Sequence, residues 1–390
     1  MTHRQYLMIP GPTPVPARAA LAEAAPMINH RGPEFGALLG EVTGALKRVF
    51  RTTHQVLIFP AAGTGAMEAA AANLVAPGER VLVAVAGEFG ARFAEIMRVM
   101  GADVRTLEFP WGAPVDPVQV NRALEADRSI RILVVTHNET STGVTMDLPA
   151  LRRAIPGDDV LFVVDAISSV GAIDVRPDEW GIDVLVGASQ KGLMAPPGLA
   201  LVAVSEEAWE KVGRTRCQSV YWSFVRAREF LERPSPQTPY TPAVSLLYAL
   251  RESLRLLEAE GLENVFRRHA VVARAIRAGV RALGLETLAA EACASNTVTA
   301  VKVPDWLDGR KLLALLQDRY GVVLAGGQGP LAGRIFRIGH VGQVGWQDAV
   351  VVLAALEMAC RDLGAELEPG LAVAAAEKVF AGEGRCPGAV

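Results

Sequence analysis

Apolar runs alternate with segments of helical periodicity along the first two thirds of the chain. The run Val-Leu-Phe-Val-Val at 160–164 is apolar throughout, which is typical of a strand buried on both faces of a sheet. In 34–50, by contrast, apolar residues recur three and four positions apart, as on one face of a helix. This alternation predicts an α/β fold in which a mostly parallel sheet lies between helices. The predicted strands are 55–59, 80–85, 103–108, 130–136, 160–165, 184–187 and 199–204, and the predicted helices are 34–50, 66–75, 91–100, 117–126 and 148–154.

The pattern changes after about residue 243, where long helical segments and fewer, shorter strands predict a smaller α+β domain. There we expect helices at 244–260, 264–283, 309–320 and 346–363, and strands at 297–303 and 334–338. Proline and glycine interrupt the start of the chain, which predicts an extended arm. We therefore expect four parts, namely an arm at 1–18, a large domain at 19–260, a small C-terminal domain at 261–365 and a weakly patterned tail at 366–390.

Composition narrows the classes of protein and partner. Of the 390 residues, 51% are hydrophobic and 21% are charged, which is enough apolar material for a large core. The net charge of −3 argues against nucleic acid or an anionic membrane as the main partner. No run approaches the roughly 18 apolar residues of a membrane helix, and no secretory signal is expected. Scattered cysteines without a CxxC pair predict neither a metal site nor a disulfide framework, but reduced thiols in the cytoplasm; they are Cys217, Cys293, Cys360 and Cys386.

Candidate chemistry is expected at the carboxyl ends of the strands, because ligands of open α/β sheets bind there. The segment Ala62-Gly63-Thr64-Gly65 lies between a predicted strand and a predicted helix. Free backbone N–H groups and the helix dipole bind phosphate at such a position, although a plain tight turn explains the same glycines. A dinucleotide site is disfavoured, because Glu68 stands where its third glycine is needed.

Two residues of opposite charge follow neighbouring apolar strands. The carboxylate of Asp165 needs a partner, which is either a protonated pyridine nitrogen or the N–H groups of the next turn. Lys191 follows 26 residues later in a loop rich in glycine and proline. Its amine can form an imine with an aldehyde cofactor and can then move a proton, whereas an isolated loop lysine is usually a surface residue.

Two further residues have a functional and a structural interpretation. The planar guanidinium of Arg337, on a predicted strand of the small domain, suits a substrate carboxylate through two parallel hydrogen bonds. Arg334 is an alternative for that role, and a salt bridge explains either arginine. Phe89 follows another strand, so its ring either stacks on a cofactor or belongs to the core.

In order and spacing, these motifs resemble the class V aminotransferases, which are fold-type I enzymes that use pyridoxal 5′-phosphate (PLP). The resemblance is closest to the alanine–glyoxylate and serine–glyoxylate (serine–pyruvate) aminotransferases and covers about residues 5–365. The segments that carry it are PGPTPVP, HRGPEFGALLGEV, AAGTGAMEA, GEFG, THNETSTGV, VVDAISSVG, GASQKGLMAPPG, TPYTPAVSLLYALRESL and GGQGPLAGRIFRIGH.

The resemblance implies a role for each motif. The activity it implies moves an amino group from a small amino acid, serine or alanine, to a 2-oxo acid, glyoxylate or pyruvate, by a ping-pong mechanism. Close relatives carry tryptophan at the stacking position. The implied roles are Lys191 for the Schiff base, Asp165 for the pyridine nitrogen, Phe89 and Ile167 for the two ring faces, Ala62, Gly63, Thr64 and Gln190 for the phosphate, Thr140 for the 3-hydroxyl and Arg337 for the substrate carboxylate.

The resemblance also implies a homodimer with shared active sites. Thr241 matches a phosphate contact made by the neighbouring subunit, and Thr238 and Tyr240 are alternatives because the alignment can slip there. The PGPTP arm, with Gly11, is expected to cross the dimer and to approach the substrate with backbone amides.

Three other functions stay open. A PLP lyase such as a cysteine desulfurase shares the fold, but those enzymes tend to carry histidine where this chain has Gln190 and Phe89, and Cys293 is the one candidate for the reactive thiol. An aminotransferase with a different donor, such as an aminoethylphosphonate or a ureidoglycine, is a second alternative. A non-catalytic relative associated with soluble hydrogenase is the third, and the presence of Lys191, Asp165 and Arg337 together argues against it.

Overall fold

The computed structural model describes residues 5–383, and its centre is a seven-stranded sheet. Strand β10 runs antiparallel to β2 and β9, while the other neighbouring pairs are parallel. The prediction of a mostly parallel sheet is therefore confirmed. In spatial order the strands are β2 (Gln55–Pro60), β10 (Leu199–Val204), β9 (Val184–Ala188), β8 (Leu161–Asp165), β5 (Ile132–Thr136), β3 (Arg80–Val85) and β4 (Asp103–Glu108).

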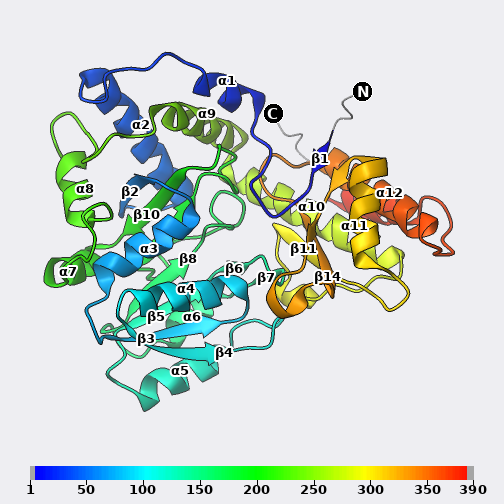
Figure 1. The fold of residues 1–390 in the computed structure, drawn as a ribbon, viewed down its shortest axis with the longest axis horizontal. Helices are drawn as coiled ribbons and strands as arrows, with labels where there is room; N and C mark the ends of the chain where they lie inside the picture. Colours follow the sequence, from blue (N-terminus) through cyan, green and yellow to red (C-terminus); the bar gives the residue numbers. More distant parts are fainter. Residues whose placement is uncertain (1–4, 384–390) are drawn as a thin grey trace.

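Helices cover both faces of this sheet, which explains why its strands are apolar throughout (Figure 1). In β5, Leu133 and Val135 enter one core, and Ile132 and Val134 enter the other. The first core is completed by α2 (Pro33–Phe50), α5 (Pro117–Ala126), α6 (Leu148–Ala154) and α9 (Val244–Glu260), and the second by α3 (Gly63–Leu74), α4 (Glu88–Val99), α7 (Glu206–Arg214) and α8 (Phe224–Leu231).

A third, separate core lies beside the large sheet, on the right of Figure 1. The N-terminal arm joins this core, because β1 (Tyr6–Leu7) pairs in parallel with β12 (Val322–Val323) and Met8 is buried in it. This arrangement supports the proposed division into a large and a small domain. The core is built on β11 (Val298–Lys302), β14 (Ile335–Gly339), β13 (Ala325–Gly326), α10 (Leu262–Ala282), α11 (Gly309–Tyr320) and α12 (Trp346–Asp362).

Short elements complete the chain. They are α1 (Ala17–Glu23), which packs on α9, β6 (Asn138–Glu139), β7 (Val144–Thr145), and two 3₁₀ turns, η1 (Glu291–Cys293) and η2 (Gly329–Leu331). Within residues 5–383, no helix combines the length and the apolarity that a membrane span requires.

Part of the weakly patterned segment after residue 366 forms a helix that the sequence pattern did not predict. Helix α13 (Leu371–Gly382) packs along α10 and buries Ala372 and Ala376 in the third core. Its sequence, LAVAAAEKVFAG, contains little contrast between an apolar and a polar face, so periodicity gives no clear signal. The small alanines allow a close approach to α10, which is a tertiary property.

The contact between α10 and α13 leads to a prediction about stability. A Cβ atom added at Gly279 would lie 2.5 Å from the Leu353 side chain and 2.9 Å from the Ala372 carbonyl oxygen. We expect Gly279→Ala to lower the free energy of unfolding by about 1–3 kcal/mol through overpacking. Urea denaturation measures this. Gly40→Ala in α2 is the matched control, because a Cβ there meets nothing within 4 Å, and it should stabilise by about 0.5–1 kcal/mol. A neutral Gly279→Ala would contradict the prediction.

Candidate active site

The predicted site residues leave the sheet at one edge. Strands β3, β5, β8 and β9 are parallel, and β2 shares their direction because both β2 and β9 are antiparallel to β10. The segments that follow these five strands therefore meet at the carboxyl edge. They carry the 62–64 turn, Phe89, Thr140, Asp165 and Lys191.

Lys191 lies in the loop after β9, against the N-terminal arm of its own chain. Its Nζ donates a hydrogen bond of 2.6 Å to the Pro10 carbonyl oxygen. Gly11 has a φ of +120°, and a Cβ there would lie 2.5 Å from the same Nζ. The positive φ favours glycine, and any larger residue would displace the end of the Lys191 side chain. The arm thus reaches the site within one chain, which differs from the expected approach across a dimer.

Asp165 ends β8 and is almost fully buried. Its Oδ1 accepts a hydrogen bond of 2.9 Å from the Ile167 N–H, and Oδ2 accepts none from the described residues. Burial raises the pKa of Asp165 to about 7, against the opposing Ile167 bond. Burial, followed by the charge of Arg337, lowers the pKa of Lys191 to about 8, and the negative charge of Asp165 opposes this. Burial therefore favours the neutral form of each group.

The 62–64 turn opens α3 with unpartnered backbone donors. Helix α3 begins at Gly63, and its N-cap Ala62 provides no capping side chain, so the first N–H groups point outward from the helix. A Cβ at Gly63 would lie 2.8 Å from Ile167, so glycine is what lets the turn approach that side chain. Thr64 follows within the first turn and is half-buried.

Gln190 supplies one more unsatisfied polar atom beside the lysine. Its Oε1 is buried and has no hydrogen-bond partner within the described part of the chain. Its backbone carbonyl accepts a bond of 3.1 Å from Thr13 of the arm. A lone buried amide oxygen costs stability, so its presence next to Lys191 in the chain is compatible with a polar ligand there.

Arg337, and not Arg334, faces the site. Arg337 is 7% exposed, whereas Arg334 is exposed to solvent. Its Nε donates to the Gly326 carbonyl at 2.8 Å, and its Nη1 donates to the Thr140 carbonyl at 3.2 Å. Among residues 5–383, Nη2 has no partner. Burial lowers the pKa of Arg337, and the nearby negative charge of Glu139 opposes this shift.

Sequence reasoning missed Gln328, although it lies within the quoted GGQGP segment. Its Oε1 accepts a bond of 3.0 Å from Nη1 of Arg337. The next residue, Gly329, has a φ of +49°, and a Cβ there would lie 3.0 Å from the Trp111 ring. The loop thus brings the Gln328 amide oxygen into contact with Arg337, while Gly329 lies close to the Trp111 ring.

Phe89 is half-buried at the start of α4 and does not belong to the buried cores, which favours the stacking interpretation over the structural one. The guanidinium carbon of Arg92 lies 4.8 Å from the centre of its ring. Glu139 was also missed, and its carboxylate accepts the Phe89 N–H at 3.0 Å.

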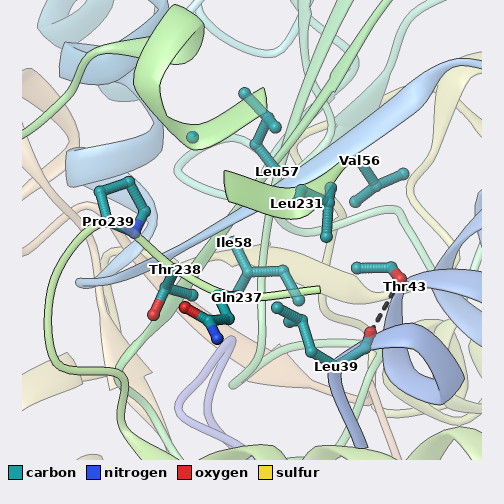
Figure 2. Close-up of a pocket in the computed structure, with 10 residues that line it drawn as sticks. Leu39, Thr43, Val56, Leu57, Ile58, Leu231, Gln237, Thr238 and Pro239 are labelled. Atoms are coloured by element: carbon teal, nitrogen blue, oxygen red, sulfur yellow. Dashed lines mark hydrogen bonds between the residues drawn. The ribbon is translucent and has the colours of Figure 1, made fainter. Parts of the chain in front are cut away.

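The three candidates for the shared phosphate contact lie in a loop that packs on α2 and β2. Figure 2 shows Thr238 with Gln237 and Pro239 beside a pocket whose other walls include Leu39 and Thr43. Arg31 holds this loop by donating to the carbonyls of Thr238, at 2.5 Å, and Pro239, at 3.3 Å. Neither Lys191, Asp165 nor Arg337 lines this pocket.

The hydroxyl groups of this loop differ in their availability. Thr238 donates to the Tyr240 carbonyl at 2.7 Å, and the Tyr240 hydroxyl donates to the Val220 carbonyl at 2.7 Å. Thr241 is exposed. Of the three, Thr241 is therefore the one whose hydroxyl makes no bond in the described chain.

Cys293 does not have the properties of a reactive thiol. Its Sγ donates to the Ala290 carbonyl at 3.5 Å, and burial raises the pKa of the thiol. A desulfurase needs a thiolate on a mobile loop, so the local chemistry argues against that alternative.

Comparison with known proteins agrees with this geometry. The family model described as aminotransferase class-V matches residues 18–335. A small subunit of soluble hydrogenase from Synechococcus sp. is 41% identical over 384 residues, which cover 97% of this chain and 99% of that protein. The serine–glyoxylate aminotransferase of Methylorubrum extorquens is 39% identical over 384 residues, which cover 96% and 95% of the two chains.

A solved structure also closely matches the fold of this chain. The crystal structure of ureidoglycine–glyoxylate aminotransferase from Bacillus subtilis superposes with a TM-score of 0.92 at 32% identity, over 98% of this chain and 99% of that one. The matched family model, the identities and the shared fold together show that this chain is an enzyme of the class V aminotransferase family, with the architecture of fold-type I.

Proposed function

We propose that this enzyme uses PLP to move an amino group from a small amino acid, such as serine or alanine, to a 2-oxo acid, such as glyoxylate or pyruvate. Bound PLP supplies an aldehyde that condenses with amines and a ring that withdraws electrons. The observation that carries the proposal is the pairing of a buried amine with a buried carboxyl group at one sheet edge, Lys191 and Asp165, beside an open turn at 62–64.

The residues present fit PLP at each end of the cofactor. The open N–H groups of residues 63–64 would donate to the phosphate oxygens, and the side-chain amide of Gln190 would lie near them. Oδ2 of Asp165, with no partner in the described chain, would face the pyridine nitrogen. Ile167 and Phe89 would pack against the two ring faces, and Thr140 would lie near the 3-hydroxyl.

Lys191 would hold the cofactor and later move the substrate's α-proton. Both tasks require a neutral amine, and burial lowers its pKa to about 8, which raises the share of that form near neutral pH. The Pro10 carbonyl oxygen accepts a hydrogen bond from this amine and so orients it toward the arm. Gly11 gives the space in which the side chain and a small substrate would lie.

Arg337 would bind the carboxylate of donor and acceptor alike, so one pocket would serve both halves of a ping-pong reaction. Two of its nitrogens are already oriented by backbone carbonyls, and Nη2 remains available. A carboxylate that binds Nη1 and Nη2 in parallel would replace the Gln328 oxygen. Both related aminotransferases compared above are named for glyoxylate as acceptor, which supports a small 2-oxo acid.

We further propose a homodimer in the cytoplasm. The exposed Thr241 would contact the phosphate at the neighbouring subunit's site. Unpaired Cys217, Cys293 and Cys360 are compatible with a reducing compartment. The hydrogenase name of the Synechococcus relative suggests a scaffold function as second candidate. It would be favoured by copurification with a partner and by a protein that binds no PLP.

Replacement of Lys191 tests the proposed chemistry. Lys191→Ala removes the amine whose charge acts on Asp165, so we expect loss of the visible absorbance of bound PLP and a fall in transamination of more than about a thousandfold. Absorption spectroscopy and single-turnover mixing with individual amino acids measure both. Near-normal transamination by this variant would refute the assignment.

Arg337→Lys tests carboxylate recognition. Lysine cannot form two parallel hydrogen bonds, so KM for both the amino acid and the 2-oxo acid should rise about tenfold or more, with cofactor absorbance unchanged. Steady-state kinetics with each substrate varied in turn measures this. Arg334→Lys, at the exposed neighbour, is the control and should leave both constants unchanged. Equal effects of the two variants would contradict the role of Arg337.

The buried carboxyl group of Asp165 leads to a pH prediction for the cofactor-free protein. Its folded pKa of about 7 lies above its ordinary value near 4, so the folded chain binds this proton more tightly than the unfolded chain. The stabilisation is complete below about pH 4 and is lost as the pH rises through about 7. Relative to Asp165→Asn, the wild-type free energy of unfolding should fall with a slope of up to about 1.4 kcal/mol per pH unit. Urea denaturation of both proteins across this pH range measures their free energies of unfolding. The prediction would be refuted if the two free energies changed with pH in the same way.

A further inference from the structure

Glu139 is a fully buried carboxylate that the proposed reaction does not use. Its exposure is 0%, and no lysine, arginine or histidine of the described chain forms an ion pair with it. Its oxygens instead accept four hydrogen bonds. Oε1 accepts from the Ser141 N–H at 3.1 Å and the Ser141 hydroxyl at 2.5 Å, and Oε2 accepts from the N–H groups of Phe89 at 3.0 Å and Gly90 at 3.2 Å.

These bonds replace a cap that α4 lacks. The N-cap of α4 is Gly87, which has no side chain to accept the first N–H groups of the helix. Two residues from the β6 segment accept them instead. The Ser141 hydroxyl accepts the Glu88 N–H at 3.0 Å, and Glu139 accepts those of Phe89 and Gly90. The first turn of α4 is thus bound to the segment of β6 and the turn after it, outside the seven-stranded sheet.

The Glu139 carboxyl group lies so close to the α4 N-cap that it restricts this position, residue 87, to glycine. A Cβ at Gly87 would lie 2.5 Å from Cδ of Glu139 and 2.5 Å from the Ser141 hydroxyl. No other residue fits there without displacement of the carboxylate. Gly87 therefore both leaves the helix uncapped and admits the external cap.

Three of the four partners of Glu139 are backbone N–H groups, which can only donate, whereas the Ser141 hydroxyl can donate or accept. Burial raises the pKa of Glu139, and the hydrogen bonds from Ser141, Gly90 and Phe89 oppose this rise. The N–H bonds to one carboxyl group fix the start of α4 against the segment that follows β5.

We propose that Glu139 is a positioning residue that, with Ser141, fixes the first turn of α4 so that the Phe89 ring is presented to the PLP ring. The proposal rests on the proposed function, since it assumes that PLP binds. Phe89 is held at its own backbone N–H, and Arg92, one turn later, lies over its ring. A shift of this turn therefore moves the ring and its cation together.

Glu139→Gln tests the proposal, because it keeps the size of the side chain and replaces one acceptor oxygen with a donor. Equilibrium titration of the cofactor-free protein with PLP should give a dissociation constant about tenfold higher than the wild type, the size expected for one lost bond to a charged group. The circular dichroism of the bound cofactor should also weaken, because the ring is less firmly oriented. Wild-type affinity and dichroism in this variant would overturn the proposal.

A double-mutant cycle separates positioning from general stability. In a Phe89→Leu background the aromatic ring is absent, so Glu139→Gln should cause no further loss of PLP affinity. The same tenfold loss in both backgrounds would overturn the proposal, because Glu139 would then act without Phe89. Should Glu139→Gln fail to fold, Ser141→Ala gives the same cycle, with an expected loss of about threefold for a neutral bond.

Asp116→Asn is the matched control, because Asp116 caps α5 by accepting the Val118 N–H at 2.9 Å. Because asparagine caps a helix about as well as aspartate, the unfolding temperature should change little, and the PLP dissociation constant should stay unchanged. A rise in that constant equal to the rise in Glu139→Gln would also overturn the proposal. Absence of PLP binding by the wild type, by contrast, would refute the proposed function itself.

Discussion

The common direction of five strands is the constraint on which the site depends. Because β2, β3, β5, β8 and β9 end at one edge, segments far apart in the chain meet there. At the same edge, Arg337 of β14 contacts Thr140 and the arm contacts Lys191, and Asp165 is almost fully buried. Burial then shifts the pKa values of Asp165 upward and of Lys191 downward, each toward the neutral form. Topology thus gathers these groups, and desolvation sets their proton affinities.

The segment that follows β5 connects the parts of this site. Each of the successive residues 137 to 140 forms a hydrogen bond with a different segment of the chain. Through these bonds the four segments are held in fixed positions relative to one another. This explains why a helix cap, a guanidinium and the acid at the end of β8 are oriented together. The contacts are the His137 N–H to the Asp165 carbonyl at 2.8 Å, the Asn138 amide to Thr297 at 2.8 Å, the Phe89 N–H to Glu139 at 3.0 Å and Arg337 to the Thr140 carbonyl at 3.2 Å.

The strands and long helices could be predicted from the sequence because their burial is recorded in the apolar pattern. Most predicted boundaries agree with the structure to within a few residues, as in α5 and β10. Two helices began three residues earlier than predicted: α3 at Gly63 and α4 at Glu88. Both start with glycine-containing turns that periodicity does not mark. Helix α13 was missed because alanines that pack closely have almost no amphipathic signal.

The sequence alone determined the class of the fold and predicted the pair Lys191 and Asp165, because strand periodicity and motif spacing are properties of neighbouring residues in the chain. Only the tertiary structure distinguishes Arg337 from Arg334, since it buries the first guanidinium and exposes the second. It alone revealed Glu139 as the cap of α4, because that contact joins residues 50 positions apart. Hydrogen bonds between distant segments leave no local pattern, so their partners become visible only after the chain has folded.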